Sequence, residues 1–157
     1  MADGYTLFCD DVRHEIGGKT TYVGRYSQVM YVPSFPFLHP KLVLAVNYIE
    51  SQIDSPVTPV DLLVYLPGDQ DDKPSLTAKL SFEDEKIGKL PDDLPAGAAN
   101  HIRAETFIEI APFKVDGPGA VKVRVRRGDE IVRLGQLQVR LRAEKSISNS
   151  DVRASEP

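Results

Sequence analysis

The sequence predicts an all-β protein: an antiparallel β-sandwich of seven or eight strands, immunoglobulin-like or C2-like in topology. Two observations carry this prediction. Four runs alternate strictly between apolar and polar residues, as a half-buried strand requires because successive side chains point to opposite faces. Prolines and glycines interrupt the chain between such runs, where strands have to end. A closed β-barrel is the alternative arrangement of the same strands.

The expected strands in the first half of the chain are mostly apolar on both faces. Residues 5–9 and 42–46 are typical of central or doubly covered strands, and residues 60–66 are similar. A further strand is expected at residues 20–26, continuing past a bulge at Gly24.

The four alternating runs cover residues 76–83, 102–110, 121–126 and 136–142. In the last two, apolar residues at odd positions alternate with polar or basic residues at even positions, so each strand has one apolar and one polar face. The turn at residues 127–130 contains a Gly-Asp pair and predicts that these two runs form a hairpin.

A length of 157 residues fits one domain. We expect the sandwich to span residues 1–142, with one short helix at residues 92–100 and a flexible C-terminal tail at residues 143–157, which has no periodicity. Hydrophobic residues make up 41% and charged residues 27% of the chain, which excludes wholesale disorder.

Composition also excludes several classes of protein. The single cysteine, Cys9, excludes an internal disulfide framework and a multi-cysteine zinc site. The formal net charge of −4 argues against a dedicated DNA-binding domain. The first residues do not resemble a leader peptide, and the longest apolar run, at residues 42–46, is too short to span a bilayer. We therefore expect no membrane association and a cytoplasmic location, by default in a bacterium.

Groups that could perform chemistry gather near the N-terminus: Cys9, Asp10, Asp11 and His14. A thiol, two carboxylates and an imidazole could act in acid–base or nucleophilic catalysis. A structural role is favoured, because a thiol in an apolar strand behaves as a small hydrophobe and aspartates at strand ends bond to local backbone. Asp10 and Asp11 are adjacent, so on a strand they point to opposite faces and form no catalytic dyad. We expect no catalytic residue and no enzyme; an enzyme using Asp10, Asp11 and His14 is the alternative.

Two acidic loops are candidates for a cation site: Asp69, Asp71 and Asp72, then Glu83, Asp84 and Glu85. Carboxylates from two loops at one end of a sandwich can share calcium, as in C2 domains. Neither loop has an ordered ligand spacing, and the three histidines (His14, His39 and His101) lack a second ligand at metal-binding spacing. We expect no metal and no cofactor, and keep a metal-dependent ligand binder using these loops as an alternative function.

Charge is distributed unevenly along the chain. Residues 50–98 hold eleven acidic residues and four lysines, whereas residues 119–142 hold seven basic and two acidic residues. Much of the positive charge falls on outward positions of the last hairpin: Lys122, Arg124, Arg126, Arg140 and Arg142. This stripe is a candidate anion- or partner-binding face, although a solvated sheet face is the commoner cause of such a pattern. It lacks interleaved aromatic residues for base stacking, so nucleic acid is not the expected partner.

Residues 7–26 contain the pattern Leu-Phe-Cys-Asp-Asp-Val-Arg-x-Glu, followed by Gly-Lys and Tyr-Val-Gly-x-Tyr. In this pattern the chain resembles a family of short uncharacterised bacterial proteins, a domain of unknown function. The resemblance implies a single-domain bacterial cytoplasmic protein and implies no catalytic residue.

The function expected from these observations is that of a non-catalytic binding or assembly module. Its partner is expected to be a protein, which could be a second copy of the chain in a homodimer. Like charges on the last hairpin oppose its pairing with itself, so such a dimer would use residues 5–9 or 29–37.

Overall fold

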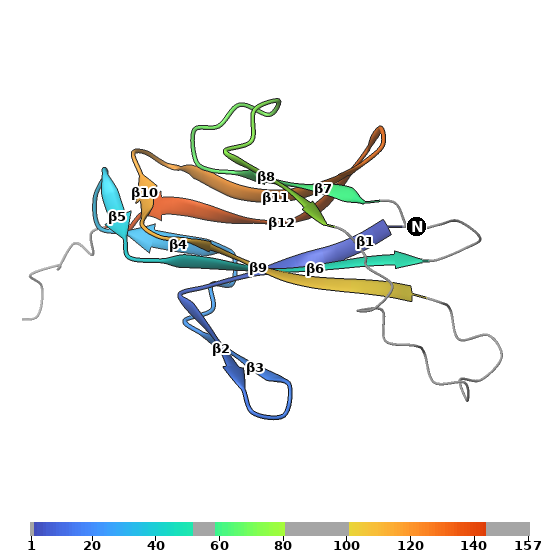
Figure 1. The fold of residues 1–157 in the computed structure, drawn as a ribbon. Helices are drawn as coiled ribbons and strands as arrows, with labels where there is room; N and C mark the ends of the chain where they lie inside the picture. The colour runs from blue at the N-terminus through green and yellow to red at the C-terminus, as the bar shows by residue number, and fades with distance from the viewer. Residues whose placement is uncertain (1, 52–58, 81–100, 144–157) are drawn as a thin grey trace, which may run out of the picture.

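The computed structural model describes residues 2–51, 59–80 and 101–143 and is built of β-strands (Figure 1). These residues contain no helix, and so none that could cross a membrane. The strands are, in chain order, β1 (Ala2–Cys9), β2 (Asp11–Glu15), β3 (Lys19–Val23), β4 (Val29–Val32), β5 (Phe37–His39), β6 (Leu42–Ser51), β7 (Val60–Tyr65), β8 (Leu76–Leu80), β9 (His101–Ile110), β10 (Phe113–Val115), β11 (Gly119–Arg127) and β12 (Glu130–Leu141). The expected helix at residues 92–100 and the tail from residue 144 onward lie outside the described residues.

Two sheets form a sandwich, and neither is closed into a barrel. One sheet has the order β1-β6-β9, and the other has the order β4-β12-β11-β7-β8. All pairings within them are antiparallel except that of β4 with β12, which is parallel. The strands β1, β6 and β9 in one sheet and β7, β8, β11 and β12 in the other follow the order of an immunoglobulin-like sandwich. The predicted fold class is therefore confirmed, and the topology favours the immunoglobulin-like alternative.

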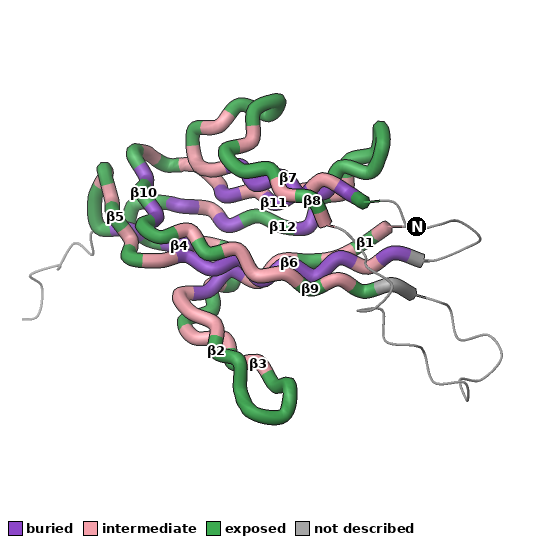
Figure 2. Tube along the Cα trace, viewed as in Figure 1, coloured by how far each residue is buried: buried purple, intermediate pink, exposed green. Residues whose placement is uncertain are grey.

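The core lies between the two sheets, where buried segments face each other (Figure 2). β6 and β11 each have a neighbour on both sides, and their inward side chains are fully buried. These side chains are Leu42, Leu44, Val46 and Tyr48 in β6 and Val121, Val123 and Val125 in β11. Each large apolar side chain buried in this way contributes about 1.5–3 kcal/mol. The alternation in the sequence thus identified the inner face of β11 correctly.

β1 differs from the prediction that it is central or covered on both faces throughout. It is an outer strand of the three-stranded sheet. Only its last residues are covered on both sides, because Phe8 and Cys9 point to opposite faces and are both buried. Tyr5 is 43% exposed. An apolar run indicates that the faces of a strand are buried. It does not indicate whether the strand is hydrogen-bonded to a neighbour along one edge or along both.

The strand expected at residues 20–26 is also different. β3 ends at Val23, and the backbone bends at Gly24, which has a φ of 63°. Tyr26 then pairs with Phe8 in an isolated antiparallel bridge, so the expected strand is interrupted at Gly24 by a bend and not by a bulge. The chain then crosses to β4, in the other sheet. β3 pairs with β2 in a separate hairpin that stands off the outer side of the three-stranded sheet, as Figure 1 shows. A second small pair, β5 with β10, lies at one end of the sandwich.

The predicted hairpin of β11 and β12 is confirmed, with Arg127 paired with Glu130 across its turn. Its ladder contains an irregularity: Val123 pairs with Gly135, but Arg124 pairs with Arg133. One residue of β12 is therefore left without an opposite residue, as in a β-bulge. This residue is Leu134, which is buried.

The far end of β12 departs from the predicted alternation. Leu137 and Val139 are fully buried, as expected. Leu141, which continues the same alternation, is 53% exposed. It is the last residue of the strand.

Candidate functional site

The outer face of the five-stranded sheet carries the predicted basic stripe. Because the valines of β11 point into the core, the basic residues between them point outward. β12 contributes two more cations that are exposed beside them. We call this surface the basic face, and its cations are Lys122, Arg124, Arg126, Arg133 and Arg140. Arg142, also predicted to be part of the stripe, lies one residue past the end of β12 and is exposed.

The cations from β11 are paired with carboxylates. Lys122 Nζ and Arg124 Nη2 both donate to Asp71 Oδ1, at 3.2 and 3.0 Å. Arg126 Nη2 donates to Asp61 Oδ2 at 2.7 Å. The predicted stripe is therefore partly neutralised along β11.

The cations from β12 differ from those of β11 in their ion pairing. Arg133 and Arg140 make no ion pair with any residue that the structure describes. The positive charge of the basic face is consequently concentrated on β12.

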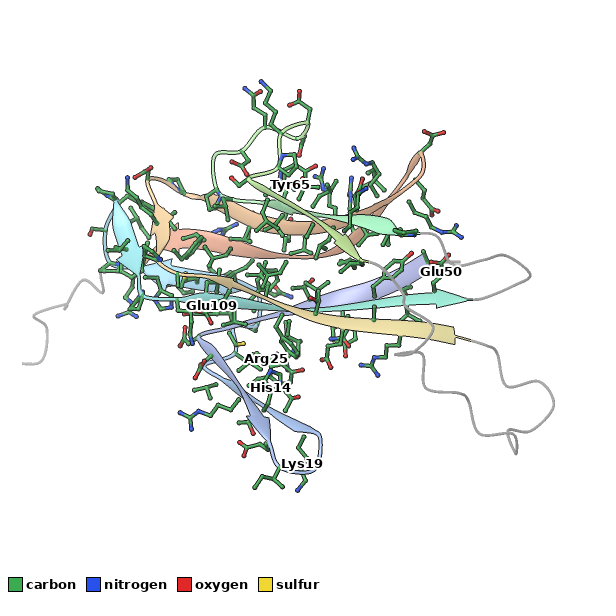
Figure 3. All side chains as sticks on the ribbon, in the orientation of Figure 1. His14, Lys19, Arg25, Glu50, Tyr65 and Glu109 are labelled. Carbon is green, nitrogen blue, oxygen red and sulfur yellow. The ribbon has the colours of Figure 1, made fainter. Side chains whose placement is uncertain are left out.

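Arg124 is held in place by an aromatic ring. Its guanidinium carbon lies 4.8 Å from the centroid of the Tyr65 ring. Tyr65 belongs to β7, pairs with Lys122 and is only 4% exposed, although it lies on the outer face (Figure 3). A guanidinium over a tyrosine ring is attracted by the negative face of the ring. The Arg124 side chain, 18% exposed, is thus fixed more firmly than a free surface arginine.

Two adjoining hollows lie on the basic face. The first has a volume of about 430 Å³ and is lined by Lys122, Val123, Arg124, Arg133, Gly135 and Gln136. The second has a volume of about 490 Å³ and is lined by Gln28, Val29, Gln136, Gln138 and Arg140. Gln136 lines both hollows, so we treat them as one trough that crosses β11, β12 and β4. Among the described residues, its walls contain four cations and three side-chain amides but no carboxylate.

The loop between β7 and β8 places Asp71 against this trough. Asp69 closes the base of the loop, because its Oδ2 accepts hydrogen bonds from the backbone N–H groups of Leu66 and Ser75 at 2.8 and 2.9 Å. Burial acts to raise the pKa of Asp69, but these hydrogen bonds outweigh it and lower the pKa below its ordinary value. Hydrogen bonds from Lys122 and then Arg124 lower the pKa of Asp71.

Two of the three candidate calcium ligands in the described loop are therefore engaged within the protein, and the third, Asp72, is exposed. Asp69 serves the loop backbone and Asp71 the cations of β11. The second acidic loop, with Glu83, Asp84 and Glu85, lies outside the described residues. Among the described residues, no three His, Cys, Asp or Glu side chains are grouped to hold a metal ion.

The candidate catalytic residues near the N-terminus have separate partners. Asp10 Oδ1 is hydrogen-bonded to the Tyr26 hydroxyl at 2.6 Å and to His39 Nε2 at 2.9 Å. Asp11 instead pairs with Lys41 at 2.5 Å, and this contact lowers the pKa of Asp11. As the adjacency of the two aspartates predicts, they do not form one dyad.

His14 and Cys9 have other contacts, with Phe107 and with the backbone oxygen of Val43. The His14 ring meets the edge of the Phe107 ring, with 5.0 Å between centroids, so it joins the β2–β3 hairpin to β9. Cys9 is fully buried, and burial followed by the charge of Asp10 raises the pKa of its thiol. Each residue of this cluster thus has a contact that explains it structurally.

Arg133 is the residue of the basic face that the alternation in the sequence missed. Its odd position groups it with Leu137 and Val139, which are buried. The irregularity beside Gly135 reverses the two faces for the part of β12 that precedes it. Gly135, a glycine directly before the alternating run at residues 136–142, is the signal from which this reversal could have been inferred, and its φ is 141°.

The segments expected to form a dimer interface expose one aromatic ring each. In residues 5–9, Tyr5 is 43% exposed, and in residues 29–37, Tyr31 is 56% exposed. Tyr31 lies beside Arg140 in the ladder of β4 and β12, at the end of the trough.

Comparison with known proteins places the chain in a family. A family model matches residues 4–140. The chain belongs to the family of unknown function DUF6941. The curated proteins and the solved structures with which the chain was compared contain no match. The predicted membership of a domain family of unknown function is thereby confirmed.

The matched range of this DUF6941 chain includes the whole trough, from Gln28 to Arg140, as well as Asp71. Arg142 lies beyond it. The trough of this chain therefore lies within the residues that the family model matches.

Proposed function

We propose that this DUF6941 domain is a non-catalytic binding module that holds an extended acidic segment of a partner protein in the trough. The observation that carries this proposal is the pair of arginines from β12. Arg133 and Arg140 line the trough and have no ion-pair partner within the described residues. A partner that supplies carboxylates at these two positions would complete their pairing.

The remaining lining fits a polypeptide partner. Gln28, Gln136 and Gln138 offer amides that both donate and accept hydrogen bonds, as the backbone of an extended segment requires. Tyr31 and Arg140 are neighbours at one end, and tyrosine and arginine are the residue types enriched where binding energy concentrates. A nucleic acid would call for exposed rings along the trough, whereas Tyr65 is covered by Arg124.

A catalytic role has less support. The trough lies open on a sheet face, and the residues described in its lining include no carboxylate, histidine or cysteine to act as acid, base or nucleophile. The residues with such groups near the N-terminus have separate partners: Asp10 is hydrogen-bonded to Tyr26 and His39, and Asp11 pairs with Lys41.

We also propose that the protein acts in a bacterial cytoplasm. The buried, unpaired thiol of Cys9 suits a reducing compartment. The resemblance of the N-terminal pattern to short bacterial proteins supports the same assignment.

The experiment is a titration of a fluorescein-labelled hexaglutamate peptide, followed by fluorescence anisotropy at 50 mM salt. The variant R133A/R140A should bind at least about tenfold more weakly than wild type, because a charge-assisted contact contributes about 1.5–3 kcal/mol and the variant loses two. The matched control is K19A/R25A, which removes the same charge from exposed positions on and beside the β2–β3 hairpin (Figure 3). Equal weakening by both variants, or no binding by wild type, would refute the proposal.

A further inference from the structure

The end of the trough at β11 already holds a carboxylate. A single oxygen of Asp71, Oδ1, accepts hydrogen bonds from Lys122 Nζ at 3.2 Å and from Arg124 Nη2 at 3.0 Å. Both cations also line the first hollow, whereas Asp71 does not. The position of this oxygen shows where the two cations together place an anion.

Arg124 has a second contact besides Asp71, and the backbone of Lys122 and Arg124 is fixed by the sheet. Arg124 lies over the Tyr65 ring and is mostly buried. Lys122 and Arg124 are two positions apart on β11, so they emerge on the same face of the sheet. The backbone of β11 is fixed by ladders with β7 on one side and β12 on the other. A site with prearranged donors loses little entropy when it binds an anion.

Asp71, in contrast, is weakly held. Its side chain is 73% exposed, and its contacts with β11 are surface ion pairs, which water and salt weaken. The loop that carries it is closed at its base by Asp69, through hydrogen bonds that do not involve Asp71. The Asp71 carboxylate can therefore leave Lys122 and Arg124 while the base of the loop stays closed.

We infer that Lys122 and Arg124 form a carboxylate-binding subsite of the trough, and that Asp71 is an internal occupant which a carboxylate of the partner displaces. This inference rests on the proposed function, because it assumes that an acidic segment lies in the trough. It adds that the protein itself competes with that segment, so that only a partner with several carboxylates in register with Arg133, Arg140 and this subsite binds well.

The test compares two asparagine substitutions in the same titration of labelled hexaglutamate. D71N removes the competing carboxylate and should tighten binding about three- to tenfold. D72N is the matched control, because it removes the same charge from the neighbouring residue. Asp72 is exposed and makes no contact with the cations of β11. D72N should change the affinity less than about twofold.

A third variant assigns the gain to the subsite. In D71N/K122A the tightening should disappear, since one of the two donors is absent. An equal gain in D71N and D72N would show that only net charge matters and would overturn the inference. Weaker binding by D71N would also overturn it, because Asp71 would then be positioning the cations rather than competing for them.

The two proposals fail in distinguishable ways. If R133A/R140A weakens binding but D71N leaves it unchanged, the trough is the binding site and the inference that Asp71 is displaced is wrong. If wild type and D71N both fail to bind hexaglutamate, the proposed function itself is wrong.

Discussion

Two leucines of β12 test where along this strand the apolar core ends. Leu137 and Leu141 share the apolar positions of one alternating run, but Leu137 is fully buried and Leu141 is 53% exposed. Replacing a fully buried leucine by alanine removes its transfer free energy and leaves a cavity, which together cost about 3 kcal/mol. Leu141 is already half in water and leaves no enclosed space, so about half of a burial free energy, roughly 1 kcal/mol, is lost.

The assay is urea unfolding of wild type, L137A and L141A, followed by circular dichroism. Both variants should keep the slope of the transition, so that the shift of the midpoint reports the change in the free energy of unfolding. A difference between the variants of about 2 kcal/mol corresponds to about 4–8 °C in melting temperature for a domain of this size. An equal loss in the free energy of unfolding in both variants would show that Leu141 is buried, and would contradict the exposed end of β12.

Two further predictions concern titratable groups in the core. Burial, followed by the Glu50 carboxylate, raises the pKa of Tyr48 from 10.0 to about 12. Because the folded protein favours the neutral phenol, Tyr48 contributes to stability fully below pH 10, and this contribution is lost as the pH rises from 10 to 12. The urea midpoint of wild type should therefore fall over this range. It should fall less in Y48F. Cys9 should react with a thiol reagent slowly in native buffer and rapidly in denaturant, because its thiol is buried and its pKa is raised. Rapid labelling of the native protein would contradict the buried end of β1.

Much of the fold could be predicted because alternation records which side of a strand is buried. It located β9, β11 and β12 and the inner face of β11, and the Gly-Asp turn predicted the pairing of the last two strands. Pairing between distant strands leaves no such local record. The parallel pairing of β4 with β12 and the outer position of β1 depend on which strands meet after the chain has folded, so they could not be inferred from the residues of either strand alone.

The glycines show a second reason for differences from the prediction. Gly24 lies within one expected strand and Gly135 directly before another, and both have a positive φ. At Gly24 the backbone bends, and only Tyr26 pairs with β1 before the chain crosses to the other sheet, whereas at Gly135 the chain stays in its strand and passes through an irregularity. A glycine permits either outcome, and the neighbouring strands decide between them.

The irregularity beside Gly135 is what turns a basic stripe into a trough. In an uninterrupted strand, Leu134 would share the outer face with Gln136 and Gln138, and Arg133 would point into the core. A leucine would then stand on the basic face, and an unpaired guanidinium would have to be buried, which is strongly unfavourable. The extra residue in β12 reverses both: Leu134 is buried in the core, and Arg133 reaches the first hollow beside Lys122 and Arg124. The same local feature therefore completes the apolar core on one side of β12 and supplies, on the other, one of the two cations on which the proposed function rests.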